Sequence, residues 1–245
     1  MKIAVCLQGQ PRFFEQGIPL LKKSFEGLDV DYFIHNWYHE EHIGEEQVPT
    51  SSPNIHKRGW TVAPNADKNL INLLSPKKYI FEKQKVFVPK YDFDLSYRNG
   101  PAEVYISQLY SRKRVGELLS EYVEQTGEKY DWVFFTRTDF ALLRNIVDEL
   151  AGPGSDEIIL TAHAPGEVWN KDHINDPFVG SNYKNMIYWS SLYDHYEQYW
   201  ISGVPFCGHR LPSHHMNLLR IPYRQILSPQ GEGWAYIRAN GLSTC

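Results

Sequence analysis

The feature that most constrains the fold is a continuous apolar run at residues 2–7, KIAVCL. A run of this length without polar alternation is typical of a β-strand that is covered on both faces, as in a parallel sheet. A helix is predicted after it, with one apolar stripe formed by Phe14, Ile18, Leu21 and Phe25. A second strand is predicted at 31–35, DYFIH. Strand, helix and strand form a βαβ unit, which implies a parallel pair with a right-handed crossover.

Further elements extend this α/β pattern. The clearest helix is predicted at about 101–126, because Pro101 suits a first helical turn and Gly127 suits a helix end. Strands are also predicted at 78–82, 132–135, 158–161 and 177–180, and helices at 67–74, at 182 to about 199, and near 213–220. Residues 38–66 are predicted as a surface loop and residues 201–245 as loop-rich. Because no repeat or linker divides the chain, we expect residues 1–245 to form a single α/β domain, with a mainly parallel twisted sheet and helices on both faces.

Composition limits the function classes. The net charge is −4 and 22% of the residues are charged, so no nucleic-acid partner is expected. The three cysteines are far apart and odd in number, which is not the pattern of a disulfide framework and suits a reducing compartment. No apolar segment has the length of a signal-peptide core or a membrane span. We therefore expect a cytoplasmic protein without a transmembrane segment and with at most peripheral membrane contact.

Polar residues follow three of the predicted strands. They are Gln8, Gly9, Gln10, Pro11 and Arg12 after the first strand, His35 and Asn36 after the second, and Arg137, Thr138 and Asp139 after the strand at 132–135. Ligands of parallel sheets bind outside the carboxyl ends of the strands, so we expect these residues to meet at one rim. On the long helix, Gln108 and Ser111 interrupt an inward stripe that begins at Val104. This end of the helix is expected to border a polar pocket, unless both side chains bond locally to backbone.

The residue types at the rim suit a ligand that carries phosphate. Gly9 allows the backbone to approach a ligand closely. Arg12 lies at a predicted helix start, where its charge and the helix dipole both favour phosphate. Asp139 suits a divalent metal or a ribose, because Mg²⁺ and Mn²⁺ prefer carboxylate oxygen. The alternative for Asp139 is structural, as an ion pair with Arg137 or as a cap on the next turn.

Four segments of the chain occur in an order that resembles a known family, namely KIAVCLQGQPRFF, DVDYFIHNW, YDWVFFTRTDF and DPFVGSNYKNM. Across nearly its whole length the chain resembles a group of GT-A-type glycosyltransferases from bacterial polysaccharide loci and large DNA viruses. The resemblance implies a GT-A (Rossmann-like) fold, a nucleotide-diphosphate sugar as donor, a divalent metal (Mn²⁺ or Mg²⁺) and a glycan acceptor. It places residues 8–12 in the nucleotide pocket and Asp139 where the last acid of the family's DXD motif stands.

The chain departs from this family at three places. Arg137 occupies the place of the first DXD acid, so a metal would rest on Asp139 alone, or Arg137 would replace part of its charge. A literal DXD at 92–94 has no buried strand before it, so we interpret it as a decoy. Near the last short helix, related enzymes carry a carboxylate and this chain carries His214 and His215. We expect His214 as a catalytic base and His215 as a metal ligand, although paired surface histidines often serve neither role.

Asp176 is the remaining candidate for the catalytic base, because it precedes the strand expected on the acceptor side. The alternative is a turn residue, which the Asn-Asp-Pro sequence favours. The sequence thus predicts a glycosyltransferase that moves a hexosyl or pentosyl unit from a nucleotide-diphosphate sugar to a glycan hydroxyl. A sugar nucleotidyltransferase is an alternative, although residues 8–12 are a poor match to its glycine-rich, lysine-bearing phosphate loop. A non-catalytic glycan-binding protein is the other.

Overall fold

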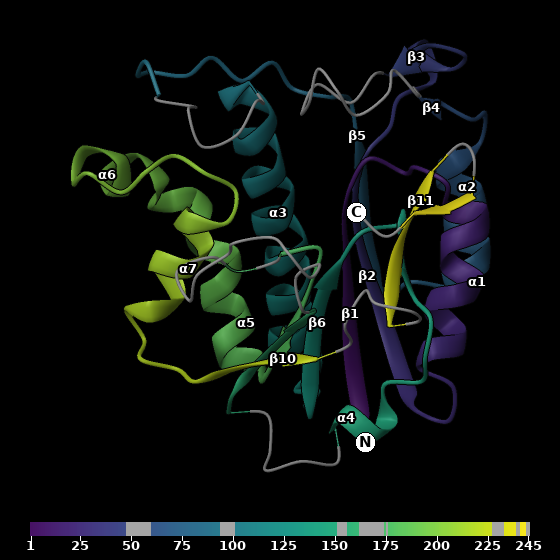
Figure 1. Cartoon of the computed structure of the whole chain (residues 1–245). Helices are drawn as coiled ribbons and strands as arrows, with labels where there is room; N and C mark the ends of the chain where they lie inside the picture. Colours follow the sequence, from purple (N-terminus) through teal and green to yellow (C-terminus); the bar gives the residue numbers. More distant parts are fainter. Residues whose placement is uncertain are drawn as a thin grey trace.

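The computed structural model describes residues 1–47, 60–93, 101–150, 156–161, 174, 176–226, 233–238 and 241–243, and the structural statements below concern those residues. The centre of the molecule is a seven-stranded sheet with the strand order β10-β8-β9-β6-β1-β2-β5 (Figure 1). Its strands are β1 (Lys2–Gly9), β2 (Asp29–Trp37), β5 (Lys78–Glu82), β6 (Trp132–Thr136), β8 (Ile158–Thr161), β9 (Phe178–Ser181) and β10 (Tyr223–Ile226). Neighbouring strands are parallel except where β9 pairs with β6 and with β8. The predicted class, an α/β fold around a mainly parallel sheet, is confirmed.

Helices cover both faces of this sheet (Figure 1). The helices are α1 (Phe14–Ser24), α2 (Ala66–Leu74), α3 (Ala102–Thr126), α4 (Val147–Leu150), α5 (Tyr183–Ser190), α6 (Tyr196–Ile201) and α7 (Arg210–Asn217), with 3₁₀ turns at Glu40–His42 and Ser191–Asp194. Two small sheets complete the fold, one from β3 (Glu46–Gln47) and β4 (Trp60–Thr61), the other from β7 (Phe140–Leu142), β11 (Trp234–Arg238) and β12 (Gly241–Ser243). Within the described chain, no helix combines the length and apolar character needed to cross a membrane.

The first strand, β1, is buried on both faces, and this is why its sequence is an unbroken apolar run. Alternate residues of β1 point to opposite faces. Ile3 and Val5 lie in the cluster that includes the buried stripe of α1, and Ala4 and Cys6 lie in the cluster that includes the inner face of α3. All four are fully buried. Burial on both faces therefore fixes β1 in the middle of the sheet, with its carboxyl end at residue 9.

The first turns of α3 depart from the predicted stripe. Val104 is 38% exposed, whereas Ile106 and Leu109 are buried. Those two residues pack into a third apolar cluster with residues of α6 and α7, such as Tyr199 and Leu211. The side of α3 that carries Ile106 and Leu109 therefore faces a layer of helices, which rotates the buried stripe away from Val104.

The carboxyl-terminal third contains more regular structure than the sequence indicated. The predicted helix at 182–199 is two helices, α5 and α6, separated by a 3₁₀ turn at Ser191–Asp194. Residues 201–245, predicted as loop-rich, contribute three strands besides α7. One of them, β11, pairs with β7, the short strand that directly follows Asp139, and Ile237 N–H donates to Asp139 O at 2.9 Å. The small sheet thereby supports the segment that carries Asp139.

Candidate functional site

The carboxyl ends of β1, β2 and β6 meet at one rim, as predicted. In the register of β1 and β2, Gln8 lies opposite His35 and Gly9 opposite Asn36. On the other side of β1, Leu7 lies opposite the last residue of β6, which precedes Arg137. Gly9 has a positive φ of 94°, and a Cβ added there would meet no atom within 4 Å. Backbone at Gly9 therefore borders open space, which leaves room for a ligand.

A buried hydrogen-bond relay holds this glycine. The Gly9 N–H donates to Ser111 Oγ at 2.7 Å, and Ser111 Oγ is 2.7 Å from His35 Nδ1. The other ring nitrogen, His35 Nε2, is 2.7 Å from Glu82 Oε1. Burial lowers the pKa of His35, although the Glu82 carboxylate opposes that shift, so the ring is neutral near pH 7. The neutral His35 ring donates from Nε2 to Glu82 and accepts on Nδ1 from the Ser111 hydroxyl. Each N–H and O–H group of the relay then has one acceptor.

The relay engages the backbone of the loop after β1. The Gly9 amide is occupied by Ser111 and is not available to read a ligand. Asn36 likewise holds the loop, since its Nδ2 donates to Gly9 O at 2.8 Å. The sequence reasoning missed Glu82, although it ends a predicted strand at the same edge of the sheet as His35. Two side-chain oxygens, Gln8 Oε1 and Asn36 Oδ1, are buried without a hydrogen-bond partner in the described structure.

Arg137 and Asp139 form a fork at the end of β6. Arg137 Nε donates to Asp139 Oδ1 at 2.8 Å, and Arg137 Nη2 donates to Oδ2 at 2.6 Å. Arg12 Nε lies 3.9 Å from the same Oδ2. Burial opposes the charge on Arg137, but the Asp139 carboxylate, with Tyr236 and Asp176, outweighs it and raises the pKa of Arg137 above its ordinary value. The ion pair that the sequence left as an alternative for Asp139 is present.

The turn between these two residues joins them to the loop after β1. Thr138 Oγ1 lies 3.2 Å from Gln10 O and 2.9 Å from Arg12 O, so its hydroxyl donates to the backbone of that loop. Helix α1 packs directly on the same turn, because a Cβ at Gly17 would stand 1.9 Å from Thr138 O. The position of Arg12 relative to Asp139 is therefore fixed by contacts from β1, α1 and β6 together.

A second arginine–carboxylate pair adjoins the first. Arg112 on α3 is 1% exposed, and its Nη2 donates to Asp176 Oδ2 at 2.7 Å. Its guanidinium also lies over the Trp189 ring, with 4.4 Å between Cζ and the ring centroid. Arg112 Nε and Nη1 are buried and have no hydrogen-bond partner in the described structure. Burial lowers the pKa of Arg112, and the charge of Asp176 opposes the shift.

The register of β9 explains why the two pairs are close. Phe178 pairs with Thr136, so Asp176 precedes β9 at the edge of the sheet where Arg137 follows β6. Arg112 is a second residue that the sequence reasoning missed, although it lies four residues after Gln108, on the part of the helix that was predicted to border a polar pocket. Gln108 lies one helical turn before Arg112 and is half-buried.

The two histidines of α7 lie in a different environment. His215 is fully buried, its Nε2 is 2.7 Å from Tyr188 O and its Nδ1 is 2.8 Å from the Tyr199 hydroxyl. Its ring stacks on Tyr188 with centroids 4.0 Å apart. Burial lowers the pKa of His215 to about 4. Because both ring nitrogens are engaged, His215 has no lone pair for the metal role expected of it. His214 is half-buried against the edge of the Tyr199 ring, and none of its described contacts involves the rim.

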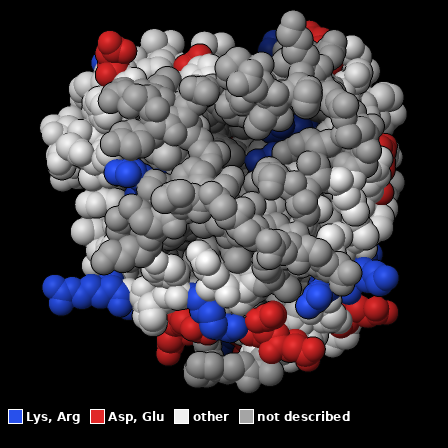
Figure 2. Space-filling model, viewed as in Figure 1, with Lys and Arg blue, Asp and Glu red and all other residues white. Residues whose placement is uncertain are grey.

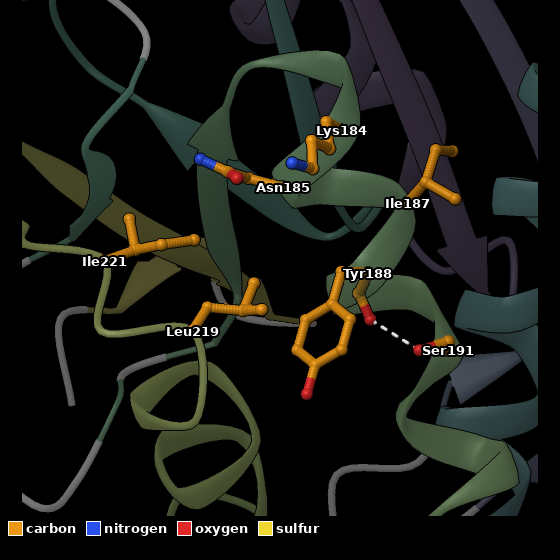
Figure 3. Close-up of a pocket in the computed structure, with 7 residues that line it drawn as sticks. All are labelled: Lys184, Asn185, Ile187, Tyr188, Ser191, Leu219 and Ile221. Carbon is orange, nitrogen blue, oxygen red and sulfur yellow. Dashed lines mark hydrogen bonds between the residues drawn. The ribbon is translucent and has the colours of Figure 1, made fainter.

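A pocket of about 480 Å³ lies beside α5, away from the predicted residues. Figure 3 shows the Tyr188 ring facing Leu219, with Ile187 and Ile221 among the lining residues. The lining is mostly apolar, and Ser191 Oγ is turned back to Tyr188 O at 2.8 Å. None of the rim residues contributes to this pocket, so it is not the predicted site.

The side chains that the structure describes at the rim do not form a donor set that fits a divalent cation. Asp139 already accepts two hydrogen bonds from Arg137, one on each oxygen. Among the residues that the structure describes, no three His, Cys, Asp or Glu side chains come together as a metal site would require. Of the literal DXD at 92–94, the third residue lies outside the described residues, and Phe93 stacks on Phe206 with centroids 4.0 Å apart.

Fold and rim together define a mixed α/β protein with a polar, arginine-rich edge on a mainly parallel sheet. No protein-family model matches the chain, and no curated protein matches it. Among solved structures, the glycosyltransferase GlyE of Streptococcus pneumoniae TIGR4 aligns with 92% of the chain at 11% sequence identity and a TM-score of 0.44. The chain spans 46% of the length of that structure. A similarity at this level carries no information on substrate or reaction.

Proposed function

We propose that the chain is a glycosyltransferase that moves a monosaccharide from a nucleotide-diphosphate sugar to a hydroxyl of a glycan. The observation that carries the proposal is the junction of the loop at 8–12 with the turn at Arg137–Asp139. Thr138 bonds to the backbone of that loop, and Arg12 lies 3.9 Å from Asp139. A glycine next to open space and two arginines at the carboxyl ends of parallel strands suit a diphosphate-bearing ligand.

In the proposed complex, each rim residue has a definite task. Gly9 gives the donor room at the end of β1, while Ser111, His35 and Asn36 keep the loop in its conformation. The unpartnered oxygens of Gln8 and Asn36 are suited to accept hydrogen bonds from a ribose or a base. Arg12 and Arg137 are suited to stabilise the charge that grows on the diphosphate as the sugar leaves.

Asp176 is the proposed base for the acceptor hydroxyl. Its side chain is 15% exposed, and Arg112 bonds only one of its two oxygens, Oδ2, in the described structure. The other oxygen is then left to take the proton of an incoming hydroxyl. His214 is not part of this proposal, because its described contacts lie with Tyr199 on the α7 side.

The test is a release assay with a panel of UDP-, GDP-, CDP- and ADP-sugars, with and without simple saccharide acceptors, which measures free nucleoside diphosphate. We expect release from at least one donor, increased by an acceptor, and a loss on the order of a hundredfold in Asp176→Asn per folded molecule, with the folded fraction measured by tryptophan fluorescence. Asp131→Asn is the matched control, because Asp131 precedes β6 at the edge of the sheet opposite the rim, where its side chain accepts the Lys2 N–H at 2.7 Å.

The same assay separates the alternatives. A sugar nucleotidyltransferase would release pyrophosphate from a nucleoside triphosphate and a sugar phosphate, and would leave nucleotide sugars intact. A non-catalytic glycan-binding protein would release nothing from any donor. Either result would remove the proposed function.

A further inference from the structure

Asp139 has the geometry of a residue that orients an arginine. A cation such as Mn²⁺ or Mg²⁺ binds carboxylate oxygens directly and demands a nearly complete shell of oxygen ligands. Both oxygens of Asp139 instead accept from the Arg137 fork, at 2.8 and 2.6 Å, and the side chain is almost fully buried. A two-bond fork between arginine and carboxylate is geometrically specific, so it fixes the plane of the guanidinium.

The fork leaves part of Arg137 for a ligand. A guanidinium has five N–H donors, and the side-on contact with Asp139 uses two of them, one on Nε and one on Nη2. The remaining donors lie on the other edge of the group. The Arg137 side chain is 18% exposed, and that of Arg12 is 24% exposed, so both arginines reach the surface of the rim.

The balance of charge at the rim favours an anion over a cation. Among the described residues, Arg12, Arg112 and Arg137 contribute three positive charges, Asp139 and Asp176 contribute two negative charges, and Glu82 is balanced by Lys85 at 3.3 Å. A divalent cation at this place would meet net repulsion, whereas a diphosphate would meet net attraction. In the space-filling view, Lys and Arg atoms are visible in the upper half of the molecule, where Figure 1 draws the carboxyl ends of β1 and β2 (Figure 2).

We propose that this chain binds the diphosphate of its donor through Arg137 and Arg12 without a divalent metal, and that Asp139 is a positioning residue for Arg137. This inference rests on the proposed function. It assigns to a guanidinium the task that the sequence resemblance assigned to a metal, which is to neutralise the leaving diphosphate. A planar guanidinium suits this task because it offers parallel donors to two phosphate oxygens.

The test is isothermal titration calorimetry of the full chain with UDP, GDP, CDP, ADP and inorganic pyrophosphate. Each titration is run in excess EDTA and again in excess Mn²⁺ or Mg²⁺. We expect at least one nucleoside diphosphate to bind with the same dissociation constant in EDTA as with metal. Arg12→Gln and the pair variant Arg137→Gln/Asp139→Asn should each weaken that binding in EDTA, by about 10- to 100-fold for the pair variant.

The variants are chosen to keep the fold intact. Removing Arg137 alone would take the two-bond fork from the buried carboxylate of Asp139, so the pair variant removes both charges together. Arg137→Lys keeps the charge but loses the fork, and should recover part of the affinity. Arg224→Gln is the control, because Arg224 forms carboxylate contacts with Glu149 and Glu157 away from the rim, and its binding should match that of the unchanged protein.

Each possible result of the titrations either supports or overturns the inference. Binding in EDTA that depends on Arg137 and Arg12 supports the inference. Binding that appears only with Mn²⁺ or Mg²⁺ overturns the inference and leaves the glycosyltransferase proposal standing. Binding in EDTA that neither arginine variant weakens overturns it as well. If no nucleoside diphosphate binds under any condition, the proposed function and the inference both fail.

Discussion

Lowering the pH should destabilise the folded chain through one buried side chain, His215. The ring donates from Nε2 to a backbone carbonyl, accepts on Nδ1 from a tyrosine hydroxyl, and is fully buried. Protonation of Nδ1 would place a donor against the hydroxyl and a charge in the core, so the folded state disfavours it. The pKa of His215 is accordingly lowered from 6.5 to about 4.

The sign and size of the effect follow from linkage. Between pH 6.5 and 4 the unfolded chain binds a proton at this position and the folded chain does not, so stability is lost as the pH falls through this window. A shift of this size corresponds to about 3 kcal/mol in full, of which about 2 kcal/mol is lost between pH 7.5 and pH 5.

The assay is urea unfolding at pH 7.5 and at pH 5, followed by tryptophan fluorescence, for the unchanged protein, His215→Gln and His214→Gln. The first variant should be less stable at pH 7.5, yet its free energy of unfolding should fall by about 2 kcal/mol less on acidification. His214→Gln, on the same helix but half-exposed, should keep the pH dependence of the unchanged protein. Equal pH dependence in all three proteins would refute the assignment of His215 as a neutral core residue.

Three further predictions concern the rim. Gly17→Ala should destabilise the fold by about 3 kcal/mol in chemical denaturation, because its Cβ would stand 1.9 Å from the backbone oxygen of Thr138, which cannot rotate away. Ser111→Ala should lower stability by about 1–3 kcal/mol and raise the KM for donor more than it lowers kcat, since it releases the loop after β1; an unchanged KM would contradict the relay. Asp176→Asn should cost about 3–5 kcal/mol by leaving Arg112 buried without its counter-charge, and Arg112→Met added to it should restore most of that loss in a double-mutant cycle.

Buried parallel strands were predictable from the sequence because their apolar runs are continuous and local. The elements after residue 181 were not predictable, because they depend on hydrogen bonds from side chains to nearby backbone and on pairing between strands that are distant in sequence. The predicted helix at 182–199 breaks where the Ser190 and Ser191 hydroxyls donate to carbonyls three residues earlier, at 2.7 and 2.8 Å. Such bonds compete with the helix. Strand β11 pairs with the nearby β12 and with β7, which lies more than ninety residues earlier in the chain, and no local pattern reports the register with β7.

The sequence predicted where the rim lies, but not which of its side chains bond to one another. Strand ends identified Gly9, His35 and Asp139, and the i, i+2 spacing of Arg137 and Asp139 made their ion pair an explicit alternative. The bonds of His35 to Glu82 and of Arg112 to Asp176 join elements that are distant in sequence. A polar residue in a sequence indicates that a partner is needed. It does not indicate which one, and so the sequence could not tell an arginine-bound carboxylate from a metal ligand.

The carboxylates of Asp139 and Asp176 are therefore suited to different roles. Asp139 has both oxygens bonded by Arg137, so a proton taken up there would break a fork that holds the guanidinium in place. Asp176 has one oxygen on Arg112 and is partly exposed, so its other oxygen can meet a substrate hydroxyl while the first bond holds the side chain. A base needs reach to its substrate before it needs a favourable pKa. By that criterion Asp139 orients the Arg137 guanidinium, which faces the donor, and Asp176 is the carboxylate that can act as base on the acceptor hydroxyl.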